Sequence, residues 1–319
     1  MGHTAGDADG GTHEDGWEVS TRTSAPPTRN RAVALAITAF VCLAAAAPRS
    51  AAAQTWRTIT SARQLHGERE MAVHVQYGAG RFRLSPGTGG ELYRMEMRYD
   101  EDTFIPVREY DPAVPSVRLG LSSRERSGVH VSLGDRRRDG ENPPTLDVAL
   151  TPDIPLTLTL EMGAVEAVAD LGGLALRRVT YRTGASATHV TFSRPNPVEC
   201  EALTIEAGAA EFRADDIANA NCARVTFRGG VGKVSLDFGG SWRRSMTGDV
   251  TVGIGSLSLR LPRDVGVEVR LNRFLASFDA AGFEKRGGAY YSGNFNSARY
   301  RLVLDVNATF GGVEVAWIN

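Results

Sequence analysis

The chain has 319 residues, of which 42% are hydrophobic and 23% charged, a composition typical of a folded domain. Its 36 basic and 37 acidic residues nearly cancel. Nucleic-acid binding requires a basic face and polybasic membrane patches require clustered Lys and Arg, so this balance favours neither class of partner.

The first 53 residues are typical of a leader. Residues 1–28 are rich in Gly, Thr, Asp and Pro and show no periodicity. Arg29 and Arg31 then precede an apolar run, 32–47, and small residues follow at 51–53. This order predicts a secretory signal peptide cleaved after Ala53, with an uncleaved N-terminal anchor as the alternative. Residues 54–319 then carry 32 basic and 32 acidic side chains.

A sequence pattern, T-x-x-x-G, recurs five times in the second half of the chain. Successive glycines of this pattern are 21, 24, 22 and 25 residues apart, at Gly163, Gly184, Gly208, Gly230 and Gly255. Strand-like alternation surrounds each copy. A period of this length built from strands and turns predicts an all-β fold, a β-helix or solenoid with coils of about 21–25 residues.

The fourth copy indicates which side chains face the core. Polar residues alternate with apolar ones, and the pattern predicts that one face is buried and the other solvated. Gly229, Gly230 and Gly232 interrupt the alternation, and we expect them to form a corner between two strand arms. The apolar residues expected to face the core are Val225, Phe227, Val231, Val234, Leu236 and Phe238.

Cys200 and Cys222 lie 22 residues apart, at equivalent points of two successive copies. Neighbouring strands of a sheet are about 4.8 Å apart, within reach of a disulfide. We therefore predict a Cys200–Cys222 bond, with two buried free thiols as the alternative.

We divide the chain into a leader (1–53), an N-terminal β region (54–155) and β-helix repeats (156–319) that are continuous with it. Further copies of the repeat pattern occur at 73–84 and 304–315. The N-terminal region has strands expected at 92–99, 117–121 and 129–133. An insertion is expected at about 262–300.

The charged residues of the repeats invite a comparison with polysaccharide-degrading β-helices, which gather carboxylates on one face. Glu161 and Glu206 each lie two residues before a repeat glycine, and Arg182 and Arg228 occupy the same position in the intervening copies. Alternating signs along one outer row predict a charge ladder between strands in preference to a catalytic pair.

No catalytic, cofactor-binding or metal-binding residues are assigned. The acidic runs at 100–102 and 215–216 lack the spacing of a calcium loop and are interpreted as solvated turns. The histidines of residues 54–319 lack metal-ligand spacing. They are His66, His74, His130 and His189.

The insertion contains the strongest candidate for a ligand or partner surface. Exposed aromatic side chains beside Asn are suited to contact with glycans or proteins. The alternative is that these aromatic residues cap the open end of the solenoid. The candidate residues are Tyr290, Tyr291, Asn294, Phe295 and Asn296.

Two segments resemble known bacterial families. The stretch 78–84 together with 91–100 resembles the toast-rack N-terminal domain, and 255–262 with 310–315 resembles the C-terminal domain of LiaF-like cell-wall stress regulators. The resemblance implies a right-handed single-stranded β-helix in the bacterial envelope, and its motifs are structural.

The sequence therefore favours a non-enzymatic exported envelope protein, in the periplasm or at the cell surface of a bacterium, that serves as a β-helical interaction or scaffold module. Its partner is an envelope protein or a glycan. A module that binds cell-wall or surface polysaccharide is the alternative, and a polysaccharide lyase or hydrolase is a weaker one.

Overall fold

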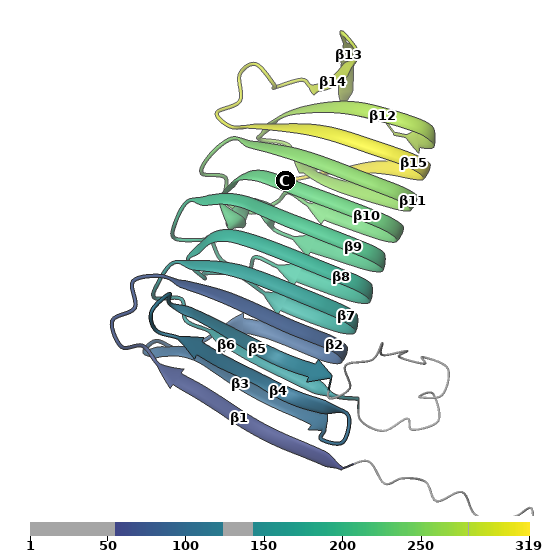
Figure 1. Cartoon of the computed structure of the whole chain (residues 1–319). Helices are drawn as coiled ribbons and strands as arrows, with labels where there is room; N and C mark the ends of the chain where they lie inside the picture. The colour runs from purple at the N-terminus through teal and green to yellow at the C-terminus, as the bar shows by residue number, and fades with distance from the viewer. Residues whose placement is uncertain (1–54, 124–142, 280) are drawn as a thin grey trace, which may run out of the picture. The chain divides into compact units, whose positions relative to one another are not determined.

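The computed structural model describes residues 55–123, 143–279 and 281–319, and residues Gln54–Asn319 form one compact unit. Apart from one short 3-10 helix, the regular elements described are strands (Figure 1). Within the described residues no helix has the length and hydropathy needed to cross a bilayer. The elements are β1 (Trp56–Gln64), β2 (Met71–Pro86), β3 (Glu91–Asp100), β4 (Phe104–Asp111), β5 (Ser116–Ser123), β6 (Thr145–Leu150), β7 (Leu156–Asp170), β8 (Leu176–Thr191), β9 (Cys200–Asp215), η2 (Ile217–Ala220), β10 (Cys222–Asp237), β11 (Met246–Pro262), β12 (Gly266–Phe278), β13 (Phe283–Arg286), β14 (Ala289–Ser292) and β15 (Arg301–Ile318).

Eight long strands stack as parallel coils, which confirms the predicted solenoid. The order along the stack is β2, β7, β8, β9, β10, β11, β15 and β12. Thr159 pairs with Thr180, Thr180 with Thr204, and Thr204 with Thr226, so the first four copies stack in the predicted register. Each coil thus repeats the environment of the previous one.

The fifth copy stacks two residues away from the predicted register. Thr226 faces Asp249, and Gly255 faces Gly232 in place of the predicted Gly230. Alternation of apolar residues cannot detect this error, because a shift of two residues keeps every side chain on its own face. The glycines at the corner decide the register, since Gly230 lies beside Gly253.

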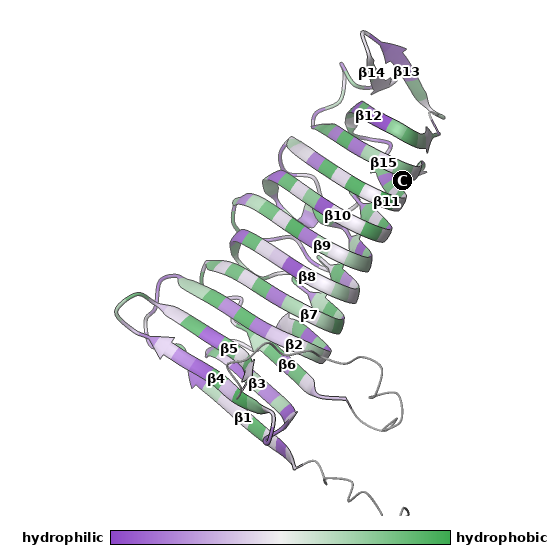
Figure 2. Cartoon of the chain, turned by 45° about the vertical axis from the view of Figure 1, so that its right-hand side comes forward, coloured by the Kyte–Doolittle hydropathy of each residue, from purple (hydrophilic) through white to green (hydrophobic). Residues whose placement is uncertain are grey.

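The core follows the predicted alternation except at the corner. Val225, Phe227, Leu236 and Phe238 are fully buried, and the hydropathy bands along each coil alternate in the same way (Figure 2). Val231 was predicted to face the core, but its side chain is 54% exposed. It lies on the outside of the bend between Gly230 and Gly232, where the alternation is interrupted.

Two columns of glycine bring the coils together at this bend. In the first column, a Cβ on Gly208, Gly230 or Gly253 would lie 3.0, 2.7 and 2.5 Å from the carbonyl oxygen of the glycine in the coil before. In the second, Gly232 and Gly255 have φ values of +142° and +139°, and a Cβ on either would overlap the carbonyl oxygen of the preceding coil. At Gly232 and Gly255 only glycine fits without strain, whereas β9 has Ala210 at the equivalent position.

The predicted disulfide is present. Cys200 and Cys222 pair across β9 and β10 with a Cα–Cα distance of 4.1 Å, and both side chains are fully buried. The bond links two successive coils at equivalent points. It closes a chain segment of 22 residues, which lowers the entropy of the unfolded state.

The N-terminal region is an excursion from the stack. β2 pairs directly with β7, and the chain between them forms β3 to β6. β1 and β6 flank β3 in antiparallel pairing, and β4 pairs with β5 as an antiparallel hairpin. Of the three strands expected here, those at 92–99 and 117–121 lie within β3 and β5, whereas 129–133 lies outside the described residues.

The C-terminal end has a topology that the sequence did not indicate. β15 inserts between β11 and β12 and is parallel to both, so the last copy of the repeat is not the end of the stack. The expected insertion contains β12 and the antiparallel hairpin β13–β14, and β14 pairs with β12.

Removal of the disulfide should destabilise the stack. We expect Cys200→Ser with Cys222→Ser to lower the free energy of unfolding by about 2–4 kcal/mol, measured by urea denaturation. Dithiothreitol should lower the stability of the wild type by a similar amount and leave the double variant unchanged. Equal stability of oxidised wild type and double variant would contradict the assignment.

Gly255 in the second glycine column should tolerate no side chain. Gly255→Ala requires a strained φ and displaces the carbonyl of Gly232, so we expect a loss of about 3 kcal/mol or more or failure to fold. Gly78→Ala is the matched control, because a Cβ there would have no atom within 4 Å. Equal midpoints of thermal unfolding for the two variants would disprove the role of the column.

Candidate functional site

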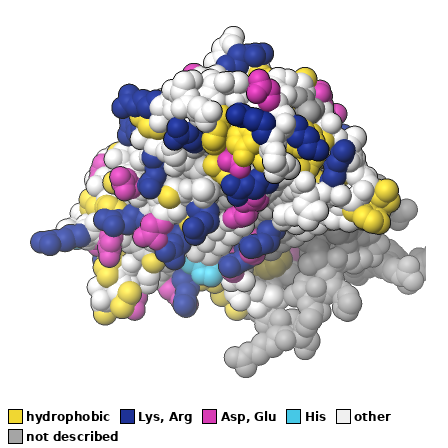
Figure 3. Space-filling view, turned by 90° about the horizontal axis from the view of Figure 1, so that it is seen from above, with side chains coloured by type: hydrophobic (Ala, Val, Ile, Leu, Met, Phe, Trp, Pro, Cys, Tyr) yellow, Lys and Arg dark blue, Asp and Glu magenta, His cyan; other side chains and the backbone are white. Residues whose placement is uncertain are grey.

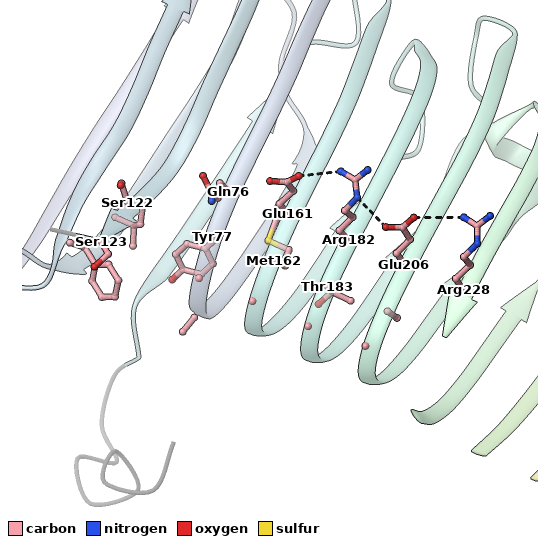
Figure 4. A pocket seen from close by; sticks show the side chains of 18 residues that line it. Gln76, Tyr77, Ser122, Ser123, Glu161, Met162, Arg182, Thr183, Glu206 and Arg228 are labelled. Atoms are coloured by element: carbon pink, nitrogen blue, oxygen red, sulfur yellow. Dashed lines mark hydrogen bonds and ion pairs between the residues drawn. The ribbon is translucent and has the colours of Figure 1, made fainter. Parts of the chain in front are cut away.

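A groove of about 760 Å³ runs along the bend over the N-terminal coils (Figure 4). One side is the open end of the hairpin β4–β5, opposite its turn at 112–115, and it contributes Phe104, Leu121, Ser122 and Ser123. β5 pairs with β2 only as far as Gly120. Beyond that point β5 continues its pairing with β4, and this open end of the hairpin forms a wall of the groove.

The opposite side of the groove is the predicted charge ladder. Arg182 donates to Glu161 and to Glu206, each over 3.1 Å, and Arg228 lies 3.7 Å from Glu206. Figure 4 shows the four side chains in one row across β7, β8, β9 and β10. The charge ladder, defined by these four residues, is confirmed.

The ladder continues toward the N-terminal coil through His74. The Nε2 atom of this histidine lies 3.1 Å from Glu161, so each glutamate of the ladder has two partners. All of these side chains are partly exposed, and exposed ion pairs contribute about 0–1 kcal/mol each. The ladder therefore fixes the positions of charged groups along the groove more than it stabilises the fold.

The floor of the groove consists of backbone and small side chains. It is formed by the part of the first glycine column on the N-terminal coils (Gly78, Gly163, Gly184 and Gly208) and by Ala79 and Ala207. Beneath it lie two buried hydroxyls, of Tyr77 and Thr183, that make no hydrogen bond within the described residues. Burial and the negative charge of Asp147 raise the pKa of Tyr77, so its phenol stays neutral.

The acidic runs outside the groove are paired with basic side chains, most of them on neighbouring strands. Glu101 pairs with Arg57 over 2.9 Å. Asp215 accepts hydrogen bonds from His189 and Arg213; partial burial opposes its ionisation, but these hydrogen bonds outweigh it and lower its pKa. Within the described residues no group of three His, Cys, Asp or Glu side chains is placed to hold a metal ion.

The predicted surface in the insertion is partly engaged in the end of the solenoid. The ring of Tyr290 lies 4.8 Å from that of Phe278 and packs against the core. The side chain of Asn294 accepts from Ser292 and donates to the carbonyl of Arg263. These contacts are those of a cap.

Other residues of the same loop keep exposed surface. Tyr291 packs against Phe295, with ring centroids 5.1 Å apart, and also lines a second hollow of about 420 Å³ beside Glu268 and Arg270. Asn296 is exposed. The ligand role of this loop stays a prediction. The groove itself was missed by the sequence reasoning, although the ladder that lines it was found.

Comparison with known proteins identifies the family. The model of the "N-terminal domain of toast_rack, DUF2154" matches residues 50–212, half of the chain. The chain belongs to the toast-rack family. The match spans β1 to most of β9, and hence most of the groove. The resemblance of the last third to LiaF-like regulators lies outside the matched residues and stays a prediction.

Solved structures resemble this toast-rack protein only loosely. A "putative cell adhesion protein" from Clostridium sporogenes has a TM-score of 0.45 at 17% identity, covering 83% of this chain and 100% of its own. A "putative adhesin" from Bacteroides fragilis has a TM-score of 0.32 at 9% identity, covering 82% and 97%. Another from Parabacteroides merdae has 0.31 at 7%, covering 82% and 96%. Such values carry no argument about function. No curated protein matches the chain.

Loss of the central ladder cation should have a small, salt-dependent effect on stability. Arg182→Gln removes the shared partner of Glu161 and Glu206, and we expect a loss of about 1–2 kcal/mol at low salt that shrinks at 0.5 M NaCl. Arg108→Gln is the control, because no ion pair of Arg108 is seen within the described residues. A loss that does not depend on salt would contradict the ladder as described.

Proposed function

We propose that this toast-rack protein is a non-enzymatic exported envelope protein whose solenoid is an interaction or scaffold module, with the groove as its contact surface. The single observation that supports the proposal is the charge ladder in the groove. It presents alternating carboxylates and guanidinium groups at the spacing of the coils, about 4.8 Å apart, on a floor of backbone. Such a row suits an extended partner with a regular sequence of polar groups.

The contacts of Glu161 and Glu206 also indicate whether the groove could catalyse hydrolysis. Glycoside hydrolases use two carboxyl groups that flank the scissile bond, one of which donates a proton. Glu161 and Glu206 are separated by Arg182, which donates to both. This geometry favours recognition over acid–base catalysis in the groove.

The disulfide supports the proposed export. Disulfides persist in oxidising compartments and are rare in the cytosol, so Cys200–Cys222 suits a protein that acts in the periplasm or at the cell surface. Cleavage of the predicted signal after Ala53 belongs to the same proposal.

A polysaccharide-binding module is the second candidate. The groove also contains neutral side chains that can exchange hydrogen bonds with sugar hydroxyls. They lie beside the ladder and are Gln76, Ser122 and Ser123. Tyr291, Phe295 and Asn296 of the capping loop are the alternative contact surface for a glycan. In this second candidate function the partner is a polysaccharide in place of a protein.

The test uses an inverted ladder, Glu161→Arg, Arg182→Glu, Glu206→Arg and Arg228→Glu. These substitutions keep the three Glu–Arg pairs of the ladder, remove the contact of His74 with Glu161, and reverse the charge pattern presented to a partner. We expect wild-type protein, crosslinked in native envelope preparations, to enrich one envelope protein at least about tenfold over the inverted-ladder variant. Glu109→Lys, near the turn end of β4 and outside the groove lining, is the control and should behave as wild type.

Equal enrichment by wild type and the inverted ladder would contradict the groove as the contact surface. Retention on peptidoglycan or polysaccharide matrices that the inversion abolishes would select the second candidate. New reducing ends or unsaturated products from a glycan panel would refute the non-enzymatic proposal. Thermal unfolding of each variant verifies that the fold is kept.

A further inference from the structure

Five of the eight exposed large apolar side chains of the described residues gather on one edge of the solenoid. Val231, Ile254, Phe310 and Leu275 are adjacent in register on β10, β11, β15 and β12. Their exposed fractions are 54%, 53%, 42% and 64%, and the neighbouring Phe274 is 74% exposed. Phe274 and Phe310 stack edge to face, with ring centroids 6.0 Å apart. We call these five residues the ridge.

The same edge is small and apolar over the other four coils. The registers align Ala79, Ala164, Ala185 and Ala209 with the ridge positions, on β2, β7, β8 and β9. Ala79 lines the groove, as do the glycines next to the other three alanines. One edge thus carries a depression in one half and a projection in the other, each four coils long.

Charge divides along the edge in the same way. The corner segments 76–82, 161–167, 182–188 and 206–212 contain four glutamates and two arginines. The corresponding segments around the ridge, 228–234, 251–257, 307–313 and 272–278, contain Arg228, Lys233 and Arg273 and no acidic residue. Figure 3, which looks onto the β12–β14 end, shows apolar side chains with Lys and Arg, and some Asp and Glu, around them.

We infer that the groove receives the ridge of a second copy of this chain, so that two solenoids pair antiparallel about a two-fold axis. The inference rests on the proposed function, in which the groove is an interaction surface, and it names the partner. Size and charge are both complementary: the bulky, cationic half of one edge meets the small, acidic half of the other. A closed two-fold pair uses the same surface on both copies.

The register of this pairing follows from the eight aligned positions. With the axis midway between β9 and β10, Ala209 faces Val231 of the second copy and Ala185 faces its Ile254. On the two flanks, Glu206 faces Arg228 and Glu211 faces Lys233. Opposite charges across an interface steer association and fix register.

A parallel arrangement of the two copies lacks this complementarity. With the axis along the edge, the two flanks of the same coil would meet across the interface. Glu206 would face Glu211, Glu161 would face Glu166, and Arg228 would face Lys233. Like charges in contact disfavour a wrong partner or register by several kcal/mol. The charges therefore select the antiparallel pair.

The size of the interface indicates a modest affinity. Eight strands about 4.8 Å apart give an edge roughly 34 Å long, and five residues across it span about 16 Å. The pair then buries on the order of 1,000 Å² in total, at the low end for specific complexes. Association is therefore expected at micromolar concentrations, and an envelope partner that binds the groove competes with it.

The experiment measures self-association of residues 54–319, the compact unit, by sedimentation equilibrium between about 1 and 200 µM. The wild type should show a monomer–dimer equilibrium. Phe310→Ser should raise the dissociation constant at least about tenfold, because each dimer contains two such contacts. Val114→Ser removes an apolar side chain that is more exposed than Phe310 (67% against 42%) but lies away from the edge, and it should leave the constant unchanged.

Charge variants and crosslinks test the orientation. Glu211→Lys should weaken the dimer at least about fivefold, and Glu211→Lys with Lys233→Glu should restore it. A mixture of Ala185→Cys and Ile254→Cys chains, treated with a short bismaleimide, should give mixed crosslinked dimers. Either variant alone should not crosslink, since its two cysteines lie roughly three coils, about 14 Å, apart along the edge.

Each of three results would overturn the inference. The first is a monomer at 200 µM, and the second is efficient crosslinking of Ile254→Cys with itself. The third is a monomer that co-sediments with anionic phospholipid vesicles through Phe274 and Phe310, which would assign the ridge to a lipid surface. The two proposals can fail separately. If the protein is a monomer but the inverted-ladder variant no longer captures an envelope partner, the proposed function holds and this inference fails.

Discussion

The spacing of neighbouring strands, about 4.8 Å, is the constraint on which this structure depends. Where each coil bends, the carbonyl of one coil lies where a side chain of the next would be. Two columns of glycine meet this constraint, and at Gly232 and Gly255 the backbone also adopts a positive φ. The long strands can therefore turn the corner without leaving the sheet, and every coil can place its apolar residues in one continuous core.

The same bend creates the surface on which function is proposed. Because side chains are absent from the first glycine column, the edge is hollow beside the charge ladder, and the hairpin β4–β5 closes the hollow where β5 departs from β2. Farther along the stack, Val231, Ile254 and Phe310 occupy the outside of the same bend and fill it. A single backbone feature thus produces both a groove and a ridge, in different halves of the solenoid.

Much of the fold could be predicted from the sequence, but less of the candidate site. Repeat spacing predicted the coils, the disulfide and the Glu–Arg ladder, because equivalent positions of stacked coils are neighbours. The repeat spacing placed the fifth copy two residues out of register, because a shift by an even number of residues leaves the alternation of apolar and polar side chains unchanged. Insertion of β15 between β11 and β12 was out of reach, because both neighbours offer the same pattern. The groove depends on the path of β5, which no local pattern records.

The account is tested most directly by the rise per coil. Thr159 and Asp305 occupy equivalent positions of β7 and β15, five coils apart in the stack. The distance between spin labels at these two positions is measured by pulsed electron–electron double resonance, with unlabelled protein in excess so that only distances within one chain are seen. The account predicts one narrow distribution centred at about 24 Å, five intervals of about 4.8 Å. A distribution centred beyond about 35 Å, or several separate populations, would contradict the continuous parallel stack.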